Sequence, residues 1–345
     1  MVEKKQKKKA GWIEAVYGIV LIAFTVYMLL DTFVITRKIT VVNAQTAESG
    51  STAGTGSTAE GRSAEQESTI DGQTANTGNT TDEQSSGDNA SQDNSTSTTG
   101  NVSTTLTTYE DDNIKITLTD YRENDTDIHV ADVVLNSSDY LKTAFAQSSY
   151  GRNVTEKTSE IADSINAILA INGDYYGAQE SGYVIRNGVI YRDEAQSGNE
   201  DLVIYEDGSF EIIQEDEVTA EELLEKGAQN VLSFGPALVE NGSISVSENE
   251  EVGKAMASNP RTAIGIIDEN HYVFVVADGR TSENEGLSLY ELAEFMESLG
   301  VTTAYNLDGG GSSTMYFNGQ IINSPTTNGH SIKERSVSDI VYIGY

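Results

Sequence analysis

Residues 263–276 have the sequence Ala-Ile-Gly-Ile-Ile-Asp-Glu-Asn-His-Tyr-Val-Phe-Val-Val, in which a short polar stretch separates two apolar runs. The flanking runs are rich in β-branched and aromatic side chains, which favour strands. Asp268 and Asn270 lie between them and favour turns. Two apolar runs joined by a short polar loop are typical of a β-hairpin, so the stretch predicts two antiparallel strands.

Similar signals extend through the chain on both sides of this hairpin. The turn pairs Asn187-Gly188 and Asp207-Gly208, each between apolar runs, predict two further hairpins. Other strands are predicted at residues 114–119, 128–135, 167–171, 301–305 and 340–343. Helices are predicted at residues 154–165, 219–226 and 289–299. Many hairpins with few helices predict an α+β domain with a mixed or antiparallel sheet.

The composition excludes several classes of protein. The chain of 345 residues has 21 basic and 54 acidic residues, a net charge of −33, and no cysteine. Nucleic acid is not an expected partner, because binding phosphates requires an excess of Lys and Arg. The lack of cysteine excludes disulfides, a thiolate nucleophile and zinc sites with cysteine ligands. The three histidines match no metal-binding spacing, and no cofactor is expected.

The N-terminal region predicts a membrane anchor. Residues 1–11 contain five lysines, and residues 12–35 form a long apolar segment with no charge from Ala15 to Leu30. Such a segment predicts one transmembrane signal-anchor helix, and the lysines predict a cytoplasmic N-terminus. The protein is therefore expected in the cell membrane as a single-pass protein, with the rest of the chain extracellular. A cleaved signal peptide is the alternative, but Arg37 and Lys38 precede the nearest small-residue cleavage site.

A polar tract separates this segment from the folded part of the chain. Residues 41–105 are dominated by Ser, Thr, Gly, Asn, Gln and acidic residues, which predicts a disordered linker. Residues 106–345 carry thirteen basic and forty-two acidic residues, and their length suffices for one substantial core. They are predicted to form the folded domain that carries the candidate site residues.

Polar residues flank the opening hairpin on both sides. Arg261 and Thr262 precede its first strand, and Asp278 and Arg280 follow its second strand. A planar guanidinium suits a phosphate or a carboxylate. A salt bridge within this acidic domain explains Arg261 equally well, and a solvated turn explains Asp278 and Arg280.

The most specific segment is residues 306–315, Asn-Leu-Asp-Gly-Gly-Gly-Ser-Ser-Thr-Met. Three successive glycines allow positive φ and a close approach to a ligand, and their N–H groups can form an anion-binding nest. Asp308, Ser312 and Ser313 add a carboxylate and hydroxyl groups. The segment is neither a Walker loop nor a nucleophile elbow. A purely structural glycine turn is the alternative.

Two further segments carry polar groups next to predicted strands. Residues 172–177, Asn-Gly-Asp-Tyr-Tyr-Gly, follow an apolar strand, so Asn172 and Asp174 are expected at the edge of a sheet. Glu334 and Arg335 precede the last strand. Ordinary turns are the alternative in both places.

Taken together, these segments resemble the phosphodiester glycosidase family, whose bacterial members are often labelled exopolysaccharide-biosynthesis proteins. The resemblance rests on residues 172–176, 260–265, 278–280, 306–315 and 334–335, which occur in the family's order. One motif departs from the family, because the common Asn-Gly-Gly-Phe-Phe here reads Asn-Gly-Asp-Tyr-Tyr. The carboxylate of Asp174 would change substrate contacts or join the catalytic carboxylates.

The resemblance implies hydrolysis of a sugar-1-phosphodiester, such as a GlcNAc-1-phosphodiester, at the anomeric carbon, in exopolysaccharide or cell-wall polymer metabolism. Asp308 and Glu334 are the leading catalytic carboxylates, followed by Asp174 and Asp278. The residues expected to bind substrate or phosphate are Asn172, Arg261, Thr262, Arg280, Gly309, Gly310, Gly311, Ser312, Ser313 and Arg335. Two other functions stay open: a non-catalytic surface glycan-binding module, and a phosphodiesterase that cuts at phosphorus with a divalent cation held by the Asp cluster.

Overall fold

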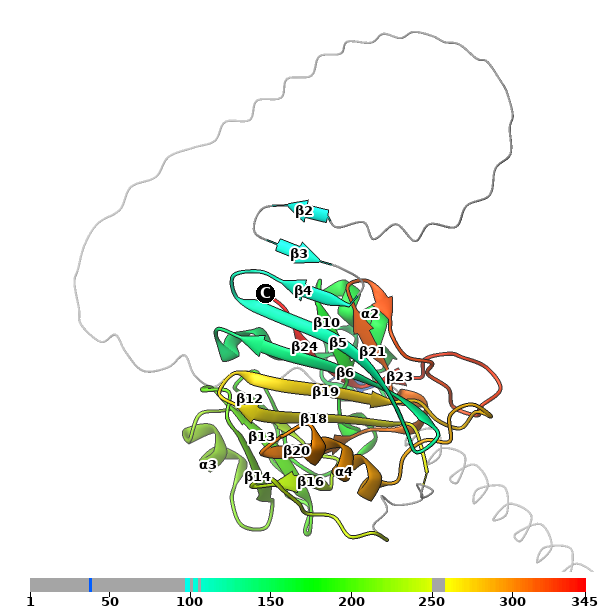
Figure 1. Ribbon diagram of the computed structural model, residues 1–345. Helices are drawn as coiled ribbons and strands as arrows, with labels where there is room; N and C mark the ends of the chain where they lie inside the picture. The colour runs from blue at the N-terminus through cyan, green and yellow to red at the C-terminus, as the bar shows by residue number, and fades with distance from the viewer. Residues whose placement is uncertain (1–36, 39–96, 100–101, 105–106, 250–257) are drawn as a thin grey trace, which may run out of the picture. The chain divides into compact units, whose positions relative to one another are not determined.

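The computed structural model describes residues 37–38, 97–99, 102–104, 107–249 and 258–345. Within these residues the protein is mostly β-sheet, with few helices (Figure 1). No helix in the described ranges is long and apolar enough to cross a bilayer. The predicted cytoplasmic end (1–11), the predicted anchor helix (12–35) and most of the predicted linker (41–105) lie outside the described residues.

The opening hairpin lies inside a ten-stranded sheet. In sheet order its strands are β17 (Ser243–Ile244), β16 (Ala237–Glu240), β20 (Thr303–Leu307), β18 (Arg261–Asp268), β19 (His271–Ala277), β6 (Thr126–Leu135), β5 (Ile114–Glu123), β4 (Thr108–Glu110), β3 (Val102–Thr104) and β2 (Ser97–Thr99). The predicted hairpin is confirmed as β18 and β19. The last residues of the predicted linker form β2 and β3. β2 pairs with β3, and β3 pairs with β4.

Two five-stranded sheets complete the framework. The first contains β22 (Gln320–Ile321), β21 (Met315–Phe317), β10 (Leu169–Asn172), β24 (Asp339–Ile343) and β7 (Leu141–Phe145). The second contains β12 (Val189–Arg192), β11 (Val184–Arg186), β15 (Ala228–Leu232), β13 (Glu200–Tyr205) and β14 (Phe210–Gln214). The two Asn-Gly and Asp-Gly hairpins are confirmed as β11–β12 and β13–β14, and the pairings within these sheets are antiparallel.

Two short strand pairs and four 3₁₀ turns lie outside these sheets. The pairs are β1 (Arg37–Lys38) with β8 (Gly151–Arg152), and β9 (Glu156–Lys157) with β23 (Ser336–Val337). The 3₁₀ turns are η1 (Ser138–Tyr140), η2 (Ala146–Ser148), η3 (Tyr176–Ala178) and η4 (Gly310–Ser312).

β19 is apolar along its length because both of its faces are buried. Tyr272, Phe274 and Val276 pack into the core shared with the five-stranded sheets, whereas Val273 and Val275 pack into the core under helix α4 (Leu289–Ser298). Side chains alternate between the two faces of a strand, so a strand covered on both faces has an unbroken apolar sequence.

The helices begin where the sequence supplies a cap. α4 follows Ser288, whose hydroxyl accepts a hydrogen bond from the backbone of Glu291, and α3 (Ala220–Glu225) follows Thr219 in the same arrangement with Glu222. The prediction of a helix over 154–165 is too long, because α2 is confined to Thr158–Ser164. Residues 156–157 instead form β9, whose partner β23 is remote in sequence.

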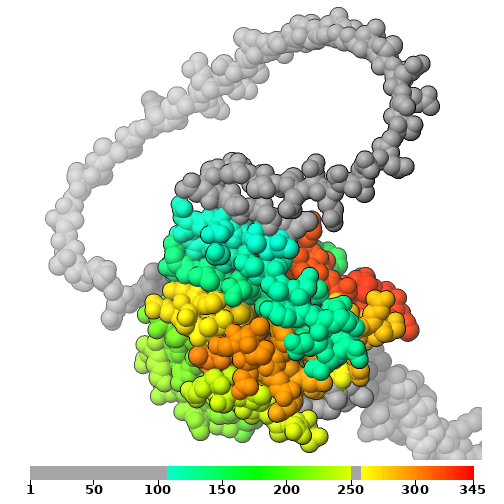
Figure 2. Space-filling view, viewed as in Figure 1, coloured from blue at the N-terminus to red at the C-terminus, as the bar shows by residue number. Residues whose placement is uncertain are grey.

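The domain is built in layers. α4 covers one face of the ten-stranded sheet, the two five-stranded sheets cover the other, and α2 and α3 each pack on a five-stranded sheet. Figure 2 shows that β5 and β6, the β18–β19 hairpin and α4 form adjoining parts of one surface although they are far apart in sequence.

Candidate active site

Antiparallel pairing brings three of the motifs to one edge of the ten-stranded sheet. β18 begins where β20 and β19 end: Thr262 lies opposite Leu307, and Arg261 lies opposite Ala277. The residues that follow β19 and β20, including Asp278 and Asp308, therefore emerge beside the start of β18. The hairpins that define the fold also assemble the site.

Asn172 at the end of β10 joins these motifs from the facing sheet. Its side-chain nitrogen donates to the carbonyl oxygen of Asp308 at 2.6 Å. Its side-chain oxygen accepts from the Thr262 hydroxyl at 2.9 Å and from the backbone N–H of Thr314 at 3.2 Å. Asn172 and Thr262 are both fully buried, so their side chains fix the backbone around Asp308.

The three glycines allow close packing of the segment that contains them. A Cβ atom on Gly309 would lie 2.9 Å from the Pro260 carbonyl oxygen, and one on Gly311 would lie 2.3 Å from the Thr327 hydroxyl. Gly310 has φ of +62° and lies against the Arg280 guanidinium, which a Cβ would approach to 2.8 Å. A larger residue at any of these positions would displace a neighbour.

Several N–H groups of this turn donate to carbonyl oxygens of the protein and are not free for the predicted anion nest. Gly310 donates its N–H to the carbonyl of Pro260, and Ser312 and Ser313 donate theirs to carbonyls within the turn. These three donors are used inside the protein, so an anion at this turn would rely largely on the neighbouring side chains.

Asp308 and Arg335 form the ionic centre of the site. One terminal nitrogen of Arg335 lies 3.0 and 3.2 Å from the two carboxylate oxygens of Asp308. The same guanidinium donates to the Ser312 hydroxyl at 2.6 and 2.8 Å. Burial raises the pKa of Asp308 above its usual value, although Arg335 and Ser312 oppose this effect. The Arg335 side chain remains 41% exposed, so it is accessible to a ligand.

Arg280 adds a second guanidinium on the other side of the glycine turn. Its side chain donates to the Asn259 side-chain oxygen at 2.8 Å and to the Thr327 carbonyl at 2.8 Å. Burial, together with the nearby charge of Arg335, lowers the pKa of Arg280. Two cations held near each other are stabilised by a ligand that carries negative charge.

Asp174 is buried in an ion-pair network. One of its oxygens accepts from Arg186 at 2.7 Å and from the Ser233 N–H at 3.0 Å, and the other accepts from the Tyr176 N–H at 2.9 Å. Arg186 also donates to Asp339 at 2.7 Å. Arg186 and Asp339 are not among the site residues predicted from the sequence, although a charged residue next to apolar strand residues is the signal that could have identified them.

Glu334 is held by helix α2. One carboxylate oxygen accepts from the backbone N–H of Ser159 at 3.0 Å, and the other accepts from the Ser159 hydroxyl at 2.6 Å. These contacts are those of a side chain that caps the first turn of a helix. Asp308 and Glu334, which were predicted to act as a pair, thus have different partners: Asp308 contacts Arg335, and Glu334 caps a helix.

Asp278 and Arg261 are also bonded within the protein. Asp278 accepts from the Ser324 N–H at 2.9 Å and from Asn323 at 3.1 Å, and it lies 3.6 Å from the ring of His129. Arg261 is buried and donates from Nε to the Leu287 carbonyl at 2.8 Å. Both residues lie at the predicted sheet edge, and their contacts there hold loops in place.

A pocket of about 200 Å³ opens at Asp308 and Arg335. Asp174 and Tyr175 line the same pocket, and Tyr175 is 42% exposed. Ser312 and Ser313 are fully buried beneath it. This active-site pocket brings together a carboxylate, an accessible cation and an aromatic ring, which suits a small anionic ligand with a ring.

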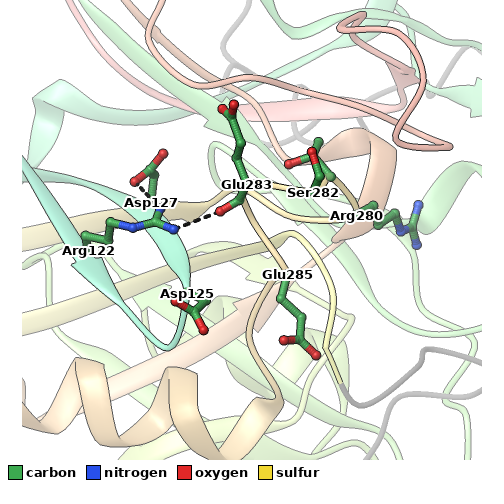
Figure 3. Close-up of a pocket in the computed structure, with 8 residues that line it drawn as sticks. Arg122, Asp125, Asp127, Arg280, Ser282, Glu283 and Glu285 are labelled. Atoms are coloured by element: carbon green, nitrogen blue, oxygen red, sulfur yellow. Dashed lines mark hydrogen bonds and ion pairs between the residues drawn. The ribbon is translucent and has the colours of Figure 1, made fainter.

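A different pocket, of about 740 Å³, is lined by Arg122 and Arg280, by two hydroxyl side chains and by four acidic residues, which outnumber the arginines. Figure 3 shows Arg122 directed at Asp127, whereas the guanidinium of Arg280 points away from them. Arg122 donates to Asp127 at 2.7 Å, so its charge is neutralised locally. This acidic pocket is a poorer site for an anion than the active-site pocket.

Within the described ranges, no group of three or more His, Asp or Glu side chains is arranged to hold a metal ion. The four predicted catalytic carboxylates have separate hydrogen-bond partners: Arg335 for Asp308, Ser159 for Glu334, Arg186 for Asp174 and Ser324 for Asp278.

Comparison with known proteins identifies similar chains. The family model described as phosphodiester glycosidase matches residues 165–344, just over half of the chain. A Bacillus subtilis protein, the SPbeta prophage-derived uncharacterized protein YomE, is 30% identical over 213 residues, which are 60% of this chain and 32% of that protein. Mouse and human N-acetylglucosamine-1-phosphodiester alpha-N-acetylglucosaminidase are 37% and 38% identical over 101 residues, which are 26% of this chain and 19% of each enzyme. The chain thus spans about a third or less of the length of these relatives.

A solved structure has a similar fold. The zebrafish N-acetylglucosamine-1-phosphodiester alpha-N-acetylglucosaminidase catalytic domain, described as auto-inhibited by its pro-peptide, superposes with a TM-score of 0.53 at 22% identity. The match covers 67% of this chain and 83% of that domain.

Proposed function

The chain belongs to the phosphodiester glycosidase family, and we propose that its folded domain hydrolyses a sugar-1-phosphodiester between the anomeric carbon and the phosphate oxygen. Membership in this family makes the protein a hydrolytic enzyme. The observation that carries the proposal is the buried Asp308 carboxylate in contact with the accessible Arg335, both of which line one pocket. The mammalian relatives are named for GlcNAc-1-phosphodiesters, so GlcNAc is the first sugar to test.

The two guanidinium groups suit the phosphate. Arg335 contacts Asp308 and remains accessible, and Arg280 lies behind Gly310. A phosphodiester already carries negative charge and departs as a stable phosphomonoester, so it needs less help from a general acid than an ordinary glycoside does. Arg335 and Arg280 would neutralise the charge that builds up on the departing phosphate.

Asp308 is assigned to the anomeric carbon. Its ionised carboxylate would accept a proton from a water molecule while the water oxygen forms a bond to the anomeric carbon. The bond from that carbon to the phosphate oxygen breaks, and its electron pair leaves with the phosphate. The products are a free sugar and a phosphomonoester. A raised pKa suits a base that works near neutral pH.

The hydrogen bonds of Asp174 support a mechanism with one reactive carboxylate. Both Asp174 oxygens accept from protein donors, and its partner Arg186 is buried, whereas the Arg335 that contacts Asp308 is accessible to the phosphate. A single displacement by water, assisted by Asp308 alone, inverts the configuration at the anomeric carbon. The inverted sugar is therefore the expected first product.

We further propose that the enzyme acts outside the cell, anchored by residues 12–35. The lysines of residues 1–11 and the apolar segment that follows support this orientation. The polar tract 41–105 would let the domain reach a surface polymer, such as an exopolysaccharide or a cell-wall polymer, as its substrate.

Hydrolysis in ¹⁸O-labelled water tests the reaction on a GlcNAc-1-phosphodiester. The proposal expects the label on the sugar C1 hydroxyl, whereas a phosphodiesterase would place it on the phosphate. Asp308→Asn is expected to lower kcat by at least about 100-fold. The matched control Asp112→Asn, on an exposed turn, should keep the wild-type rate.

The other two candidate functions predict different results. A metal-dependent phosphodiesterase would lose activity with a chelator and label the phosphate. A glycan-binding module would bind the substrate without releasing either product. Full turnover by Asp308→Asn would show that another residue activates the water.

A further inference from the structure

We propose that a second pocket beside the active-site pocket is a subsite for a neutral sugar unit on the phosphate side of the substrate; this inference rests on the proposed function. The second pocket has a volume of about 380 Å³. Tyr150, Arg152, Tyr191 and Arg192 line it, together with Tyr176. We call it the tyrosine pocket.

The tyrosine pocket and the active-site pocket share a wall. Residues 150–152 and 179–180 line the tyrosine pocket, whereas Asn153 and Gly177 line the active-site pocket. The N–H of Asn153 donates to the carbonyl of Gly177 at 3.0 Å and joins the two segments of this wall. Because Arg152 and Asn153 are consecutive, the two pockets are about one residue apart at that point, or ~3.8 Å between Cα atoms.

The size of the active-site pocket shows the need for a neighbouring site. Its volume of about 200 Å³ is below the roughly 300–1,000 Å³ of pockets that enclose a small ligand. It therefore accommodates only part of a sugar phosphodiester. A substrate whose phosphate contacts Arg335 would extend beyond this pocket, and the tyrosine pocket adjoins it.

The aromatic rings of the tyrosine pocket hold one another in place. Tyr150 and Tyr176 are stacked, with ring centroids 5.3 Å apart and an interplanar angle of 17°. Tyr191 packs edge-on against Phe145 at 4.8 Å and lies 5.1 Å from Tyr150. Tyr150 and Tyr176 are buried, and Tyr191 is half-buried. Rigid aromatic side chains bind a ring-shaped ligand with little loss of conformational entropy.

Arg152 offers a buried donor to this pocket. Its Nε atom has no hydrogen-bond partner among the residues that the structure describes. A buried donor left unsatisfied is destabilising, so a ligand acceptor oxygen that reaches this atom as the side chain adjusts would gain a hydrogen bond. Sugar hydroxyl and ring oxygens are acceptors of this kind. Arg192 is already fixed, because it donates to the carbonyls of Tyr176 and Gln179.

The charges around this pocket favour a neutral ligand. Arg152 forms an ion pair with Glu180, and the exposed Asp193 and Glu194 also line the pocket. A phosphate or a uronic acid would be repelled by these carboxylates, whereas a neutral pyranose would not. The phosphate therefore belongs to the active-site pocket, and the unit beyond it belongs to the tyrosine pocket.

Kinetics with two substrates test the proposal on the full chain. One substrate is a GlcNAc-1-phosphate methyl ester, and the other carries methyl glucopyranoside, linked through O6, in place of the methyl group. Tyr191→Ala is expected to lower kcat/KM about fivefold or more for the glucoside substrate only. Tyr191→Phe keeps the ring and should retain the wild-type ratio. The control Tyr121→Ala removes an exposed tyrosine from β5 and should change neither substrate.

A binding measurement separates this inference from the proposed function. Saturation-transfer NMR with methyl glucopyranoside 6-phosphate needs no turnover. Irradiation of the aromatic protons should transfer saturation to the glucoside protons in the wild type and in Asp308→Asn, but not in Tyr191→Ala. If the wild-type protein has no glycosidase activity but still shows this transfer, the proposed reaction is wrong and the proposed subsite stands.

Three results would overturn the subsite. The first is an equal loss of kcat/KM on both substrates in a folded Tyr191→Ala variant, as judged by circular dichroism. The second is saturation transfer that persists unchanged in Tyr191→Ala and Arg152→Gln. The third is a preference for the glucoside substrate that survives both substitutions, because it would show that the sugar binds elsewhere.

Discussion

At the scale of single residues, the charge state of Asp308 depends on two opposing effects. Burial disfavours its ionised form and raises its pKa, whereas the guanidinium of Arg335 favours the ionised form. Because the proposed mechanism requires the carboxylate, activity should rise as the pH passes the pKa of Asp308.

Replacing Arg335 with Gln removes the nearest stabilising charge. The pKa of Asp308 should then rise further, so the acidic limb of the kcat/KM profile should move to higher pH by roughly one unit. A pH–rate profile measures this shift. Arg122→Gln, which removes a guanidinium that contacts Asp127, is the control. An acidic limb that stays in place, or moves to lower pH, would contradict the role of Asp308.

The sequence predicted which motifs lie near one another better than it predicted the hydrogen-bond partners of their residues. Asp308 and Arg335 lie together as two separate motifs suggested. The charges of Arg186 and Asp339 next to apolar residues mark them as unusual, but no local pattern shows that Arg186 pairs with Asp174, 12 positions away, and with Asp339, 153 positions away. The partner of one nest N–H was also not predicted, because Pro260, which accepts from Gly310, lies outside the motif.

At the scale of elements, Glu334 links the last loop to helix α2. It accepts hydrogen bonds from the N–H and the hydroxyl of Ser159, at the start of the helix. A carboxylate at this end of a helix interacts favourably with the helix dipole.

Glu334→Gln should therefore affect stability more than catalysis. The free energy of unfolding should fall by about 1 kcal/mol, while kcat stays within about twofold of the wild type. Urea denaturation and steady-state kinetics measure the two effects. Glu297→Gln, on the exposed face of α4, is the matched control. A large loss of kcat at unchanged stability would return Glu334 to a catalytic role.

Elements with local signals were predicted well, and elements that depend on distant partners were not. The hairpins carry their own turn residues, as at Asn187-Gly188, and α4 carries its own cap in Ser288. β9 has no such signal, because its pairing with β23 joins residues almost 180 positions apart. The prediction therefore extended the helix over residues that form a strand.

At the scale of the whole molecule, a buried acidic pair makes folding depend on pH. Asp201 is fully buried beside Glu215, and its two oxygens have no donor among the described residues. Burial, together with the charge of Glu215, raises the pKa of Asp201 well above its usual value. Glu215 accepts from the N–H of Tyr183 at 2.9 Å, so its carboxylate is held in place next to Asp201. The folded state therefore binds the Asp201 proton more tightly than the unfolded chain does.

The direction in which pH changes the stability follows from the number of protons that the folded and unfolded states bind. Between the ordinary pKa of an Asp, about 4, and the raised pKa of the folded state, the folded protein holds one proton more than the unfolded chain. The contribution of Asp201 to stability is thus fully present below about pH 4 and is lost as the pH rises through its folded pKa. Asp201→Asn should remove this loss, so its stability relative to wild type should increase with pH.

Chemical denaturation of wild type and Asp201→Asn at several pH values between 4 and 8 measures the difference. Asp112→Asn, on an exposed turn, should follow the wild type at every pH. If the free energy of unfolding changes with pH in the same way for Asp201→Asn and wild type, the folded and unfolded states bind this proton equally, which would contradict the prediction.

The position of β24 restricts when the domain can fold during synthesis. This final strand lies between β10 and β7, and it supplies Asp339 to the ion pair with Arg186. Until residues 339–343 have been made, β10 lacks one neighbour and Arg186 lacks one carboxylate. Domains fold as units, so the strands that precede β24 must wait, incompletely paired, until β24 has left the ribosome. Folding of the whole domain is therefore limited by the synthesis of one short strand that lies far from β7 and β10 in the sequence.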